Sequence, residues 1–194
     1  MNSKISKFAI LLIITAAMSG IFMFVITGGQ PVSSLITVML SFILGGLFSS
    51  VLMMLLMPNM MLTTHLSRYN SVEETCRKLE EAIQANGWYC PAVRNINQSI
   101  SKHGGTLGRE VQVVELCNSE YGADVLKTNP EVSTLMPCAW GVYQGDDGRV
   151  YITGMNTGMM GKMFGGNIAR VMGGNVAEDE EKILGSVIKT SSGE

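Results

Sequence analysis

The feature that most constrains this chain is a pair of long uncharged apolar runs, residues 8–27 and 35–57, that precede a polar remainder. Each run is long enough to cross the hydrocarbon core of a bilayer as a helix. Only two charged residues, both lysines before the first run, occur in residues 1–57. We therefore expect residues 1–57 to form a membrane anchor of two transmembrane helices and residues 58–194 to form one soluble domain.

The flanking charges predict the orientation of this anchor. Seven uncharged residues, 28–34, join the two runs, so both chain ends are expected on the same side of the bilayer. Lys4 and Lys7 precede the first run and further basic residues follow the second, which places that side in the cytoplasm of a bacterial cell with an inner membrane. Removal of the first run as a signal peptide would instead place the domain in the periplasm. The first run is about twice the usual length of the apolar core of a signal peptide, which favours retention.

The soluble part has a mildly acidic composition. Residues 58–194 carry 12 basic and 16 acidic residues and no basic cluster, which argues against a nucleic-acid partner. Neither apolar run contains an ionisable residue, so the lipid bilayer is the expected partner of the anchor and transport chemistry is not expected there. In the reducing cytoplasm the four cysteines need no disulfide partners.

The patterning of the soluble part predicts an α+β fold. Ser71 and Glu74 form a capping box that opens a helix with one apolar stripe, and Asn86-Gly87 ends it. Residues 60–69 fit either a strand or a continued helix. The other expected elements are strands at 88–93, 111–117, 137–144 and 149–153, a short helix at 120–128 and a terminal helix at 178–188. Helices packed on one face of a mainly antiparallel sheet fit this order.

Four segments together resemble one known family. They are Ser71–Glu74 with its helix, Val114–Asn118 before a short helix, Leu135–Cys138 leading into a strand, and Asp147-Gly148 before Val150–Ile152. In this order and spacing they resemble the domain of unknown function 302 family over residues 62–188. The resemblance implies a curved antiparallel sheet backed by helices, a tendency to form homodimers and no established activity. This chain departs from the family pattern in having serine after Cys117-Asn118, where the family usually has proline, and in a tail richer in methionine and glycine.

Cys117 and Cys138 are the sharpest candidates for chemistry. Each is expected at the edge of a strand, and Cys117 just before a helix start, a position that lowers the pKa of a thiol and favours metal binding or redox exchange. No Cys-x-x-Cys spacing occurs, and two thiolates do not complete the four ligands that zinc requires. A purely structural role and a thiol-dependent role both stay open.

The second candidate feature is a stripe of methionine and other apolar side chains after residue 156. Methionine-rich faces adapt to varied partners, so the stripe is either part of the core or a face for an apolar ligand, a partner helix or the bilayer. Its candidate contact residues are Met159, Met160, Met163, Phe164 and Met172. The acidic run Glu178–Glu181 is expected to be a solvated first helical turn, and His103 a solvated loop residue.

These observations lead to one main hypothesis and one alternative. The main hypothesis is a non-enzymatic binding or interaction module, anchored in the inner membrane and dimeric through its soluble domain, with a second copy or a membrane protein as partner. The alternative is a thiol-dependent redox, sulfur-handling or metal-binding protein that uses Cys117 and Cys138. The sequence contains no Ser-His-Asp grouping, catalytic carboxylate pair or nucleotide-binding fingerprint, and it identifies no cofactor.

Overall fold

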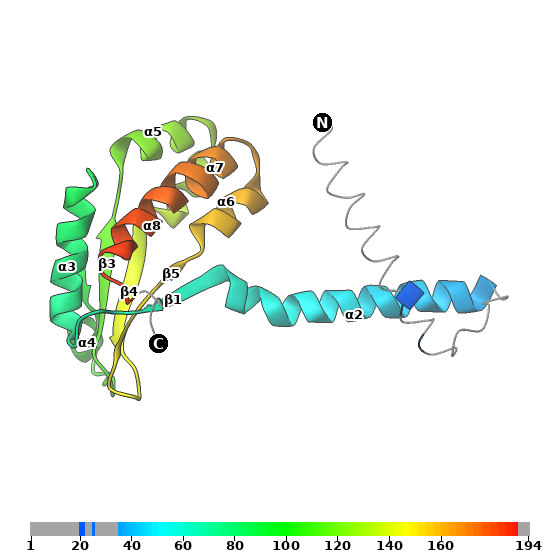
Figure 1. Ribbon diagram of the computed structural model, residues 1–194, viewed down its shortest axis with the longest axis horizontal. Coiled ribbons are helices and arrows are strands. Elements are labelled where there is room, and N and C mark those ends of the chain that lie inside the picture. The colour runs from blue at the N-terminus through cyan, green and yellow to red at the C-terminus, as the bar shows by residue number, and fades with distance from the viewer. Residues whose placement is uncertain (1–19, 22–24, 26–34, 190–194) are drawn as a thin grey trace. The chain divides into compact units, whose positions relative to one another are not determined.

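The computed structural model describes residues 20, 21, 25 and 35–189 of the chain. The chain divides into two units, residues 1–58 and residues 59–194. The second unit contains all of the strands and most of the helices that the structure describes (Figure 1).

Helix α2 (Leu35–Met61) is 27 residues long, and the side chains that the structure describes on it are mostly exposed and apolar. Pro58, expected just beyond the helix, lies within its last turn, where the missing N–H removes only one backbone hydrogen bond. The predicted span 8–27 lies outside the described residues apart from three positions. Within the parts of the chain described in full, no helix is both long and apolar enough to cross a bilayer. The two-helix anchor therefore stays a prediction.

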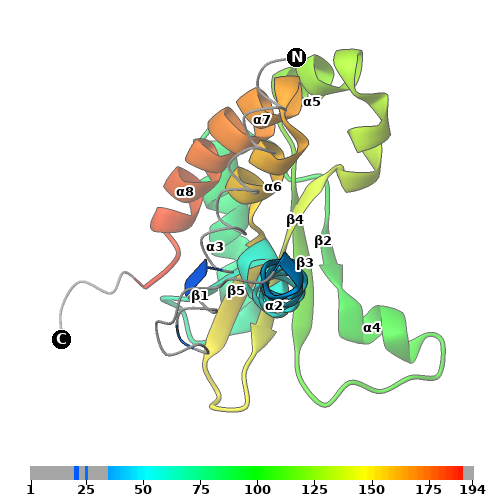
Figure 2. The ribbon, with the colours of Figure 1, turned by 90° about the vertical axis from the view of Figure 1, so that its right-hand side faces the viewer.

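A five-stranded antiparallel sheet forms the centre of the second unit, as expected for an α+β fold. Its strand order is β1-β5-β4-β3-β2, which Figure 2 shows with β1 and β2 at opposite edges. The strands are β1 (Leu62–Leu66), β2 (Val93–Asn95), β3 (Val111–Leu116), β4 (Cys138–Gln144) and β5 (Val150–Met155). The regular strand expected at 88–93 does not form. Tyr89 makes a single bridge to Cys117, and regular pairing with β3 begins only at Val93. Pro91 lies between the two and cannot donate to the ladder.

Helix α3 (Val72–Ala85) begins as its capping box predicts. The hydroxyl of Ser71 accepts a hydrogen bond from the backbone N–H of Glu74 at 3.2 Å. Its apolar stripe is buried on β3 and β4, and the helix also contacts α8 (Ala177–Gly185). The stripe consists of Val72, Cys76, Leu79 and Ile83. The other helices before β4 are α4 (Ile96–Ser101), α5 (Ser119–Thr128) and the short 3₁₀-helix η1 (Pro130–Leu135).

The methionine- and glycine-rich segment after β5 is helical. It forms α6 (Thr157–Phe164), α7 (Gly166–Arg170) and a π-helical turn, η2 (Val171–Val176), that continues into α8. A Cβ added at Gly161 of α6 would lie 2.3 Å from the backbone nitrogen of Gly173. The glycines of this segment therefore allow two helical backbones to touch, which brings η2 and the start of α8 against α6.

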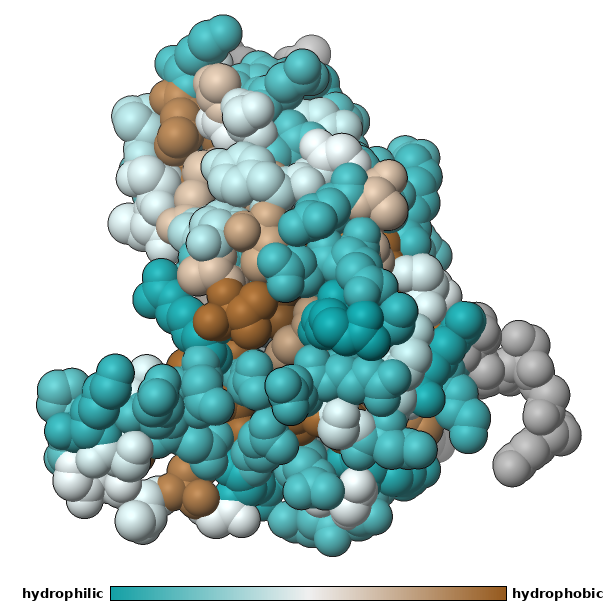
Figure 3. Space-filling model, turned by 90° about the vertical axis from the view of Figure 1, so that its left-hand side faces the viewer, coloured by the Kyte–Doolittle hydropathy of each residue, from teal (hydrophilic) through white to brown (hydrophobic). Residues whose placement is uncertain are grey.

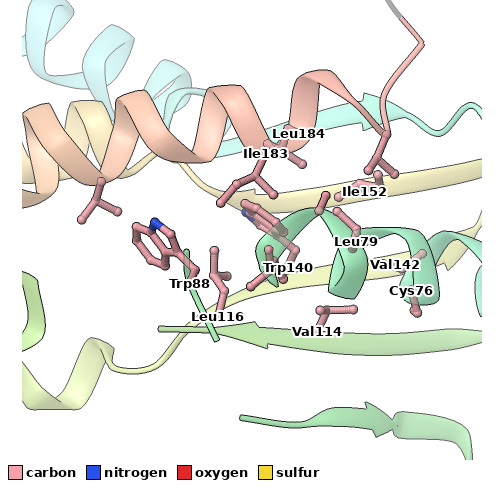
Figure 4. Close-up of a cluster of buried hydrophobic side chains, with 14 of the residues drawn as sticks. Cys76, Leu79, Trp88, Val114, Leu116, Trp140, Val142, Ile152, Ile183 and Leu184 are labelled. Atoms are coloured by element: carbon pink, nitrogen blue, oxygen red, sulfur yellow. The ribbon is translucent and has the colours of Figure 1, made fainter. Parts of the chain in front are cut away.

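The core lies between one face of the sheet and the helices α3 and α8 (Figure 4). Alternate residues of the three central strands supply it: Val114, Leu116, Trp140, Val142, Val150 and Ile152. Trp140 pairs across the sheet with Gly154, and a Cβ at Gly154 would lie 2.4 Å from the Trp140 ring. Figure 3, viewed from the side of α3, shows a mainly hydrophilic surface on which apolar atoms form separate patches.

Replacing Gly154 by alanine is expected to destabilise the domain. The added methyl group would meet the rigid indole of Trp140, and overpacking of this kind costs about 1–3 kcal/mol. The chain has two tryptophans, Trp88 and Trp140, both in this core, so tryptophan fluorescence during denaturant unfolding of the full-length protein measures the domain selectively. Gly122→Ala is the control, because Gly122 lies inside α5 with open space around it, and there the change should stabilise slightly. Equal stability of the Gly154→Ala variant and the parent would contradict the proposed contact.

Candidate functional site

A hollow of about 410 Å³ opens where β4 begins and β5 ends. It is bounded by η1, the two strand ends, α6, η2 and α8, and it is named here the Glu180 hollow. Its lining is mainly apolar and includes Leu62, Met136, Cys138, Met155, Met172 and Glu180. A concave apolar site of several hundred Å³ with few polar groups has the size and character typical of small-molecule sites.

Glu180 is the polar group that distinguishes this hollow. Its side chain is 7% exposed, and Oε2 accepts a hydrogen bond from the hydroxyl of Thr157, at the start of α6. Among the described residues no donor reaches the other oxygen, Oε1, and no basic group pairs with the carboxylate. Glu115 is the other buried carboxylate, and Arg94 binds it at 2.6 Å. Of these two buried carboxylates, only Glu180 therefore lacks a cationic partner within the described part of the chain.

Burial raises the pKa of Glu180 to about 7, and the hydrogen bond from Thr157 lowers it by a smaller amount. Burial disfavours the charged form of the carboxylate, while the hydroxyl donor favours that form. At neutral pH the site is therefore divided between a protonated and an ionised state. Titratable groups with such perturbed pKa values in a hollow are candidates for functional residues.

A second hollow, of about 290 Å³, lies on another side of the same carboxyl group. It is lined by β1, the β5–α6 junction and α8, and its polar residues include His65, Asn156, Glu180 and Glu181. The lining of the two hollows contains neither lysine nor arginine. The carboxyl groups of Glu180 and Glu181, with no lysine or arginine beside them in these linings, disfavour anionic ligands.

The two cysteines predicted as a chemical pair lie near each other. Cys138 begins β4 opposite Leu116, the residue before Cys117, and both cysteines line a small apolar pocket of about 30 Å³ with Trp88 and Tyr121. Burial, together with the charges of Glu180 and Cys117, raises the pKa of Cys138 to about 12. At neutral pH Cys138 is therefore a neutral thiol, and a neutral thiol is a poor nucleophile and a poor metal ligand.

The five candidate residues of the methionine stripe divide between core and surface. Met172, in the π-helical turn, is buried and lines both the Glu180 hollow and the small pocket. Met163 and Phe164 are more than half exposed at the end of α6, and Met159 and Met160 are half-buried. Only Met172 of the five therefore lies at the hollow.

The central residue of the site, Glu180, differs from its expected place in a solvated acidic run. Glu178 and Glu181 are exposed, but Glu180 lies on the buried stripe of α8. The spacing contained this signal, because Glu180 follows Val176 by four residues and precedes Ile183 and Leu184 by three and four. Because all four residues of the run 178–181 are acidic, the run was predicted to be solvated, although Glu180 has helical spacing with its apolar neighbours.

The described part of the chain contains no group of three or more histidine, cysteine, aspartate or glutamate side chains placed to hold a metal ion. His103 is exposed in the loop after α4, away from the lining of the hollows described above.

Comparisons with known proteins agree with the fold. The model of the family described as "Domain of unknown function DUF302" matches residues 63–189. The chain is also similar to a solved structure described as "Crystal structure of uncharacterized conserved protein DUF302 from Bacillus stearothermophilus", with 21% identity and a TM-score of 0.58. That similarity covers 66% of this chain and 98% of the other, and at this identity it shows the fold alone. No curated protein matches the chain.

Replacing Glu180 by glutamine is expected to change how stability depends on pH. Since the folded-state pKa lies above the ordinary value of 4.5, the carboxyl stabilises the fold at low pH and loses this contribution as pH rises through about 7. The variant cannot ionise, so above pH 7 its free energy of unfolding should exceed that of the parent by up to about 3 kcal/mol. The two should differ little at pH 4.5, where both side chains are neutral.

Denaturant unfolding of the full-length protein, followed by tryptophan fluorescence at several pH values, measures this difference. Glu178→Gln is the matched control, because Glu178 is exposed on the same helix and pairs with Lys182 at 3.0 Å. A difference between parent and Glu180→Gln that stays constant from pH 4.5 to 8 would contradict the assigned burial of the charge.

Proposed function

Because the chain belongs to the DUF302 family, whose description assigns no activity, we propose a function from the site itself: a membrane-anchored, non-enzymatic module that binds a small apolar molecule in the Glu180 hollow. The observation that carries this proposal is the buried carboxyl group of Glu180, which keeps one oxygen without a donor at an apolar hollow. A buried acceptor without a partner costs free energy, and a ligand that supplies the donor recovers it.

The membrane anchor is part of the same proposal. Its support is the uncharged apolar character of residues 8–27 and 35–57. Lys4 and Lys7 support a cytoplasmic domain at the inner membrane, and the periplasm is the alternative.

We also propose a homo-oligomer or a membrane-protein partner. Half-buried Val113, Tyr143 and Tyr151, on the sheet face opposite the core, support a protein contact there.

Thiol chemistry at Cys117 and Cys138 is the second candidate function. Its support is that both side chains line one small pocket. The raised pKa of Cys138 counts against redox, sulfur-handling and metal-binding roles, because each of these roles needs a thiolate. Binding at the Glu180 hollow is therefore the function that the geometry supports better.

The binding proposal predicts that 1-hexanol, a small neutral apolar probe, enters the Glu180 hollow. Titrating it into full-length protein labelled with ¹³C in the methionine methyl groups should shift the Met155 and Met172 signals, because both side chains line the hollow. The exposed Met163 lies outside it and should not respond. Met155 and Met172 signals that stay fixed up to the solubility limit of hexanol would overturn the binding proposal. Cys117→Ser is expected to bind hexanol as the parent does, because Cys117 lines the small pocket and is not among the residues that line the Glu180 hollow.

The anchor predicts the location of the C-terminus. A reporter enzyme that is active only in the periplasm, fused after Glu194, should be inactive while the fusion sediments with the membranes, because two spans return the chain to the cytoplasm. The matched control deletes residues 28–57, which leaves one span preceded by Lys4 and Lys7 and should reverse the sign of the signal. An active reporter on the intact chain would place the domain in the periplasm, and a fusion in the soluble fraction would rule out the anchor.

A further inference from the structure

We infer that the Glu180 hollow selects a protonated amine with at least one N–H, carried on an apolar chain, and that this N–H is donated to Oε1 of Glu180. This inference rests on the proposed binding function and names its ligand class. It starts from two independent observations: a carboxyl group more than nine-tenths buried with one oxygen free of donors, and an adjoining apolar hollow of about 410 Å³.

The charge of the site calls for a cation. An ionised carboxylate taken out of water is costly unless an opposite charge accompanies it. The domain meets this need at Glu115, its other described buried carboxylate, with the guanidinium of Arg94 at 2.6 Å. At Glu180 the lining contributes no lysine or arginine, and its other titratable groups are Cys138, His65 and Glu181. A cationic ligand would supply at Glu180 what Arg94 supplies at Glu115.

The donor pattern selects an amine over other cations. Oε1 needs an N–H or O–H donor, which a quaternary ammonium group lacks, and neither hollow is lined by the phenylalanine, tyrosine or tryptophan rings that bind such groups by cation–π contact. Calcium and magnesium prefer six or more oxygen ligands, and the Glu180 hollow offers one carboxylate and the Thr157 hydroxyl as its side-chain oxygens close to each other. An ammonium group with at least one proton meets both requirements.

The rest of the lining sets the character of the ligand body. Leu62, Met136, Met155 and Met172 offer apolar contact, and methionine side chains adjust to ligands of different shape. Burying each methylene of such a ligand contributes to affinity without requiring a polar partner. The site therefore suits an alkyl or similarly apolar amine more than a compact hydrophilic one.

The test compares four probes with the same six-carbon chain: hexylamine, 1-hexanol, hexanoate and hexyltrimethylammonium. Each is titrated at pH 8 into the full-length ¹³C-methionine-labelled protein, with the Met155 and Met172 methyl signals as the readout. Hexylamine is expected to bind at least tenfold more tightly than hexanol, and hexanoate and hexyltrimethylammonium more weakly than hexylamine. The advantage of hexylamine over hexanol should disappear in Glu180→Gln and persist in Glu178→Gln, which removes an equal charge from the exposed side of α8.

The outcomes separate this inference from the binding function on which it rests. Equal affinity for hexylamine and hexanol would overturn amine selection while leaving the hollow as a binding site. Binding of neither probe would overturn both. An amine advantage that persists in Glu180→Gln would also overturn the inference. If that variant unfolds, nuclear Overhauser contacts between the hexylamine methylene next to nitrogen and the Met172 methyl group in the parent protein decide the matter, and their absence would count against it.

Discussion

The contact between Trp140 and Gly154 is the constraint on which the rest of the domain depends. The indole lies across the neighbouring strand at a position where any side chain would collide with it. This placement lets the ring fill the space between the sheet and α8, beside Ile183 and Leu184 (Figure 4). Trp140 thus fills the core and also sets the position of α8, the helix that carries Glu180.

The position of α8 explains why a carboxyl group is buried at all. The apolar stripe of the helix holds Ile183 and Leu184 in the core, and Glu180 lies one turn earlier on the same stripe. Gly161 and Gly173 let the π-helical turn and α6 approach until Thr157 reaches the carboxylate. Packing therefore holds the group in an apolar place with a single donor, a situation that proteins tolerate at functional sites at a cost in stability.

Periodicity predicted most of the fold, because each regular element buries one face. The capped helix from Val72, the strand pair around the Asp147-Gly148 turn and the α+β class follow from such patterns. The regular strand predicted at 88–93 was wrong, because Pro91 interrupts the hydrogen-bond ladder and Tyr89 forms only a single bridge. Glycine doublets weaken one long continuous helix after residue 156, and the helical segment is divided at Gly165 between α6 and α7. Cys138 was recognised as a candidate, but its neutral state depends on burial that no local pattern encodes.

The proposed anchor and the proposed ligand class are physically consistent with each other. An amine on an apolar chain is an amphiphile, and it concentrates at the surface of a bilayer with its ammonium group among the headgroups. A binding module tied to the same bilayer by residues 1–57 would meet such a molecule at a local concentration far above that in bulk water. Even a modest affinity at the Glu180 hollow would then suffice for occupancy. The uncompensated carboxylate and the apolar N-terminal runs, which lie far apart in the sequence, thus support one proposal.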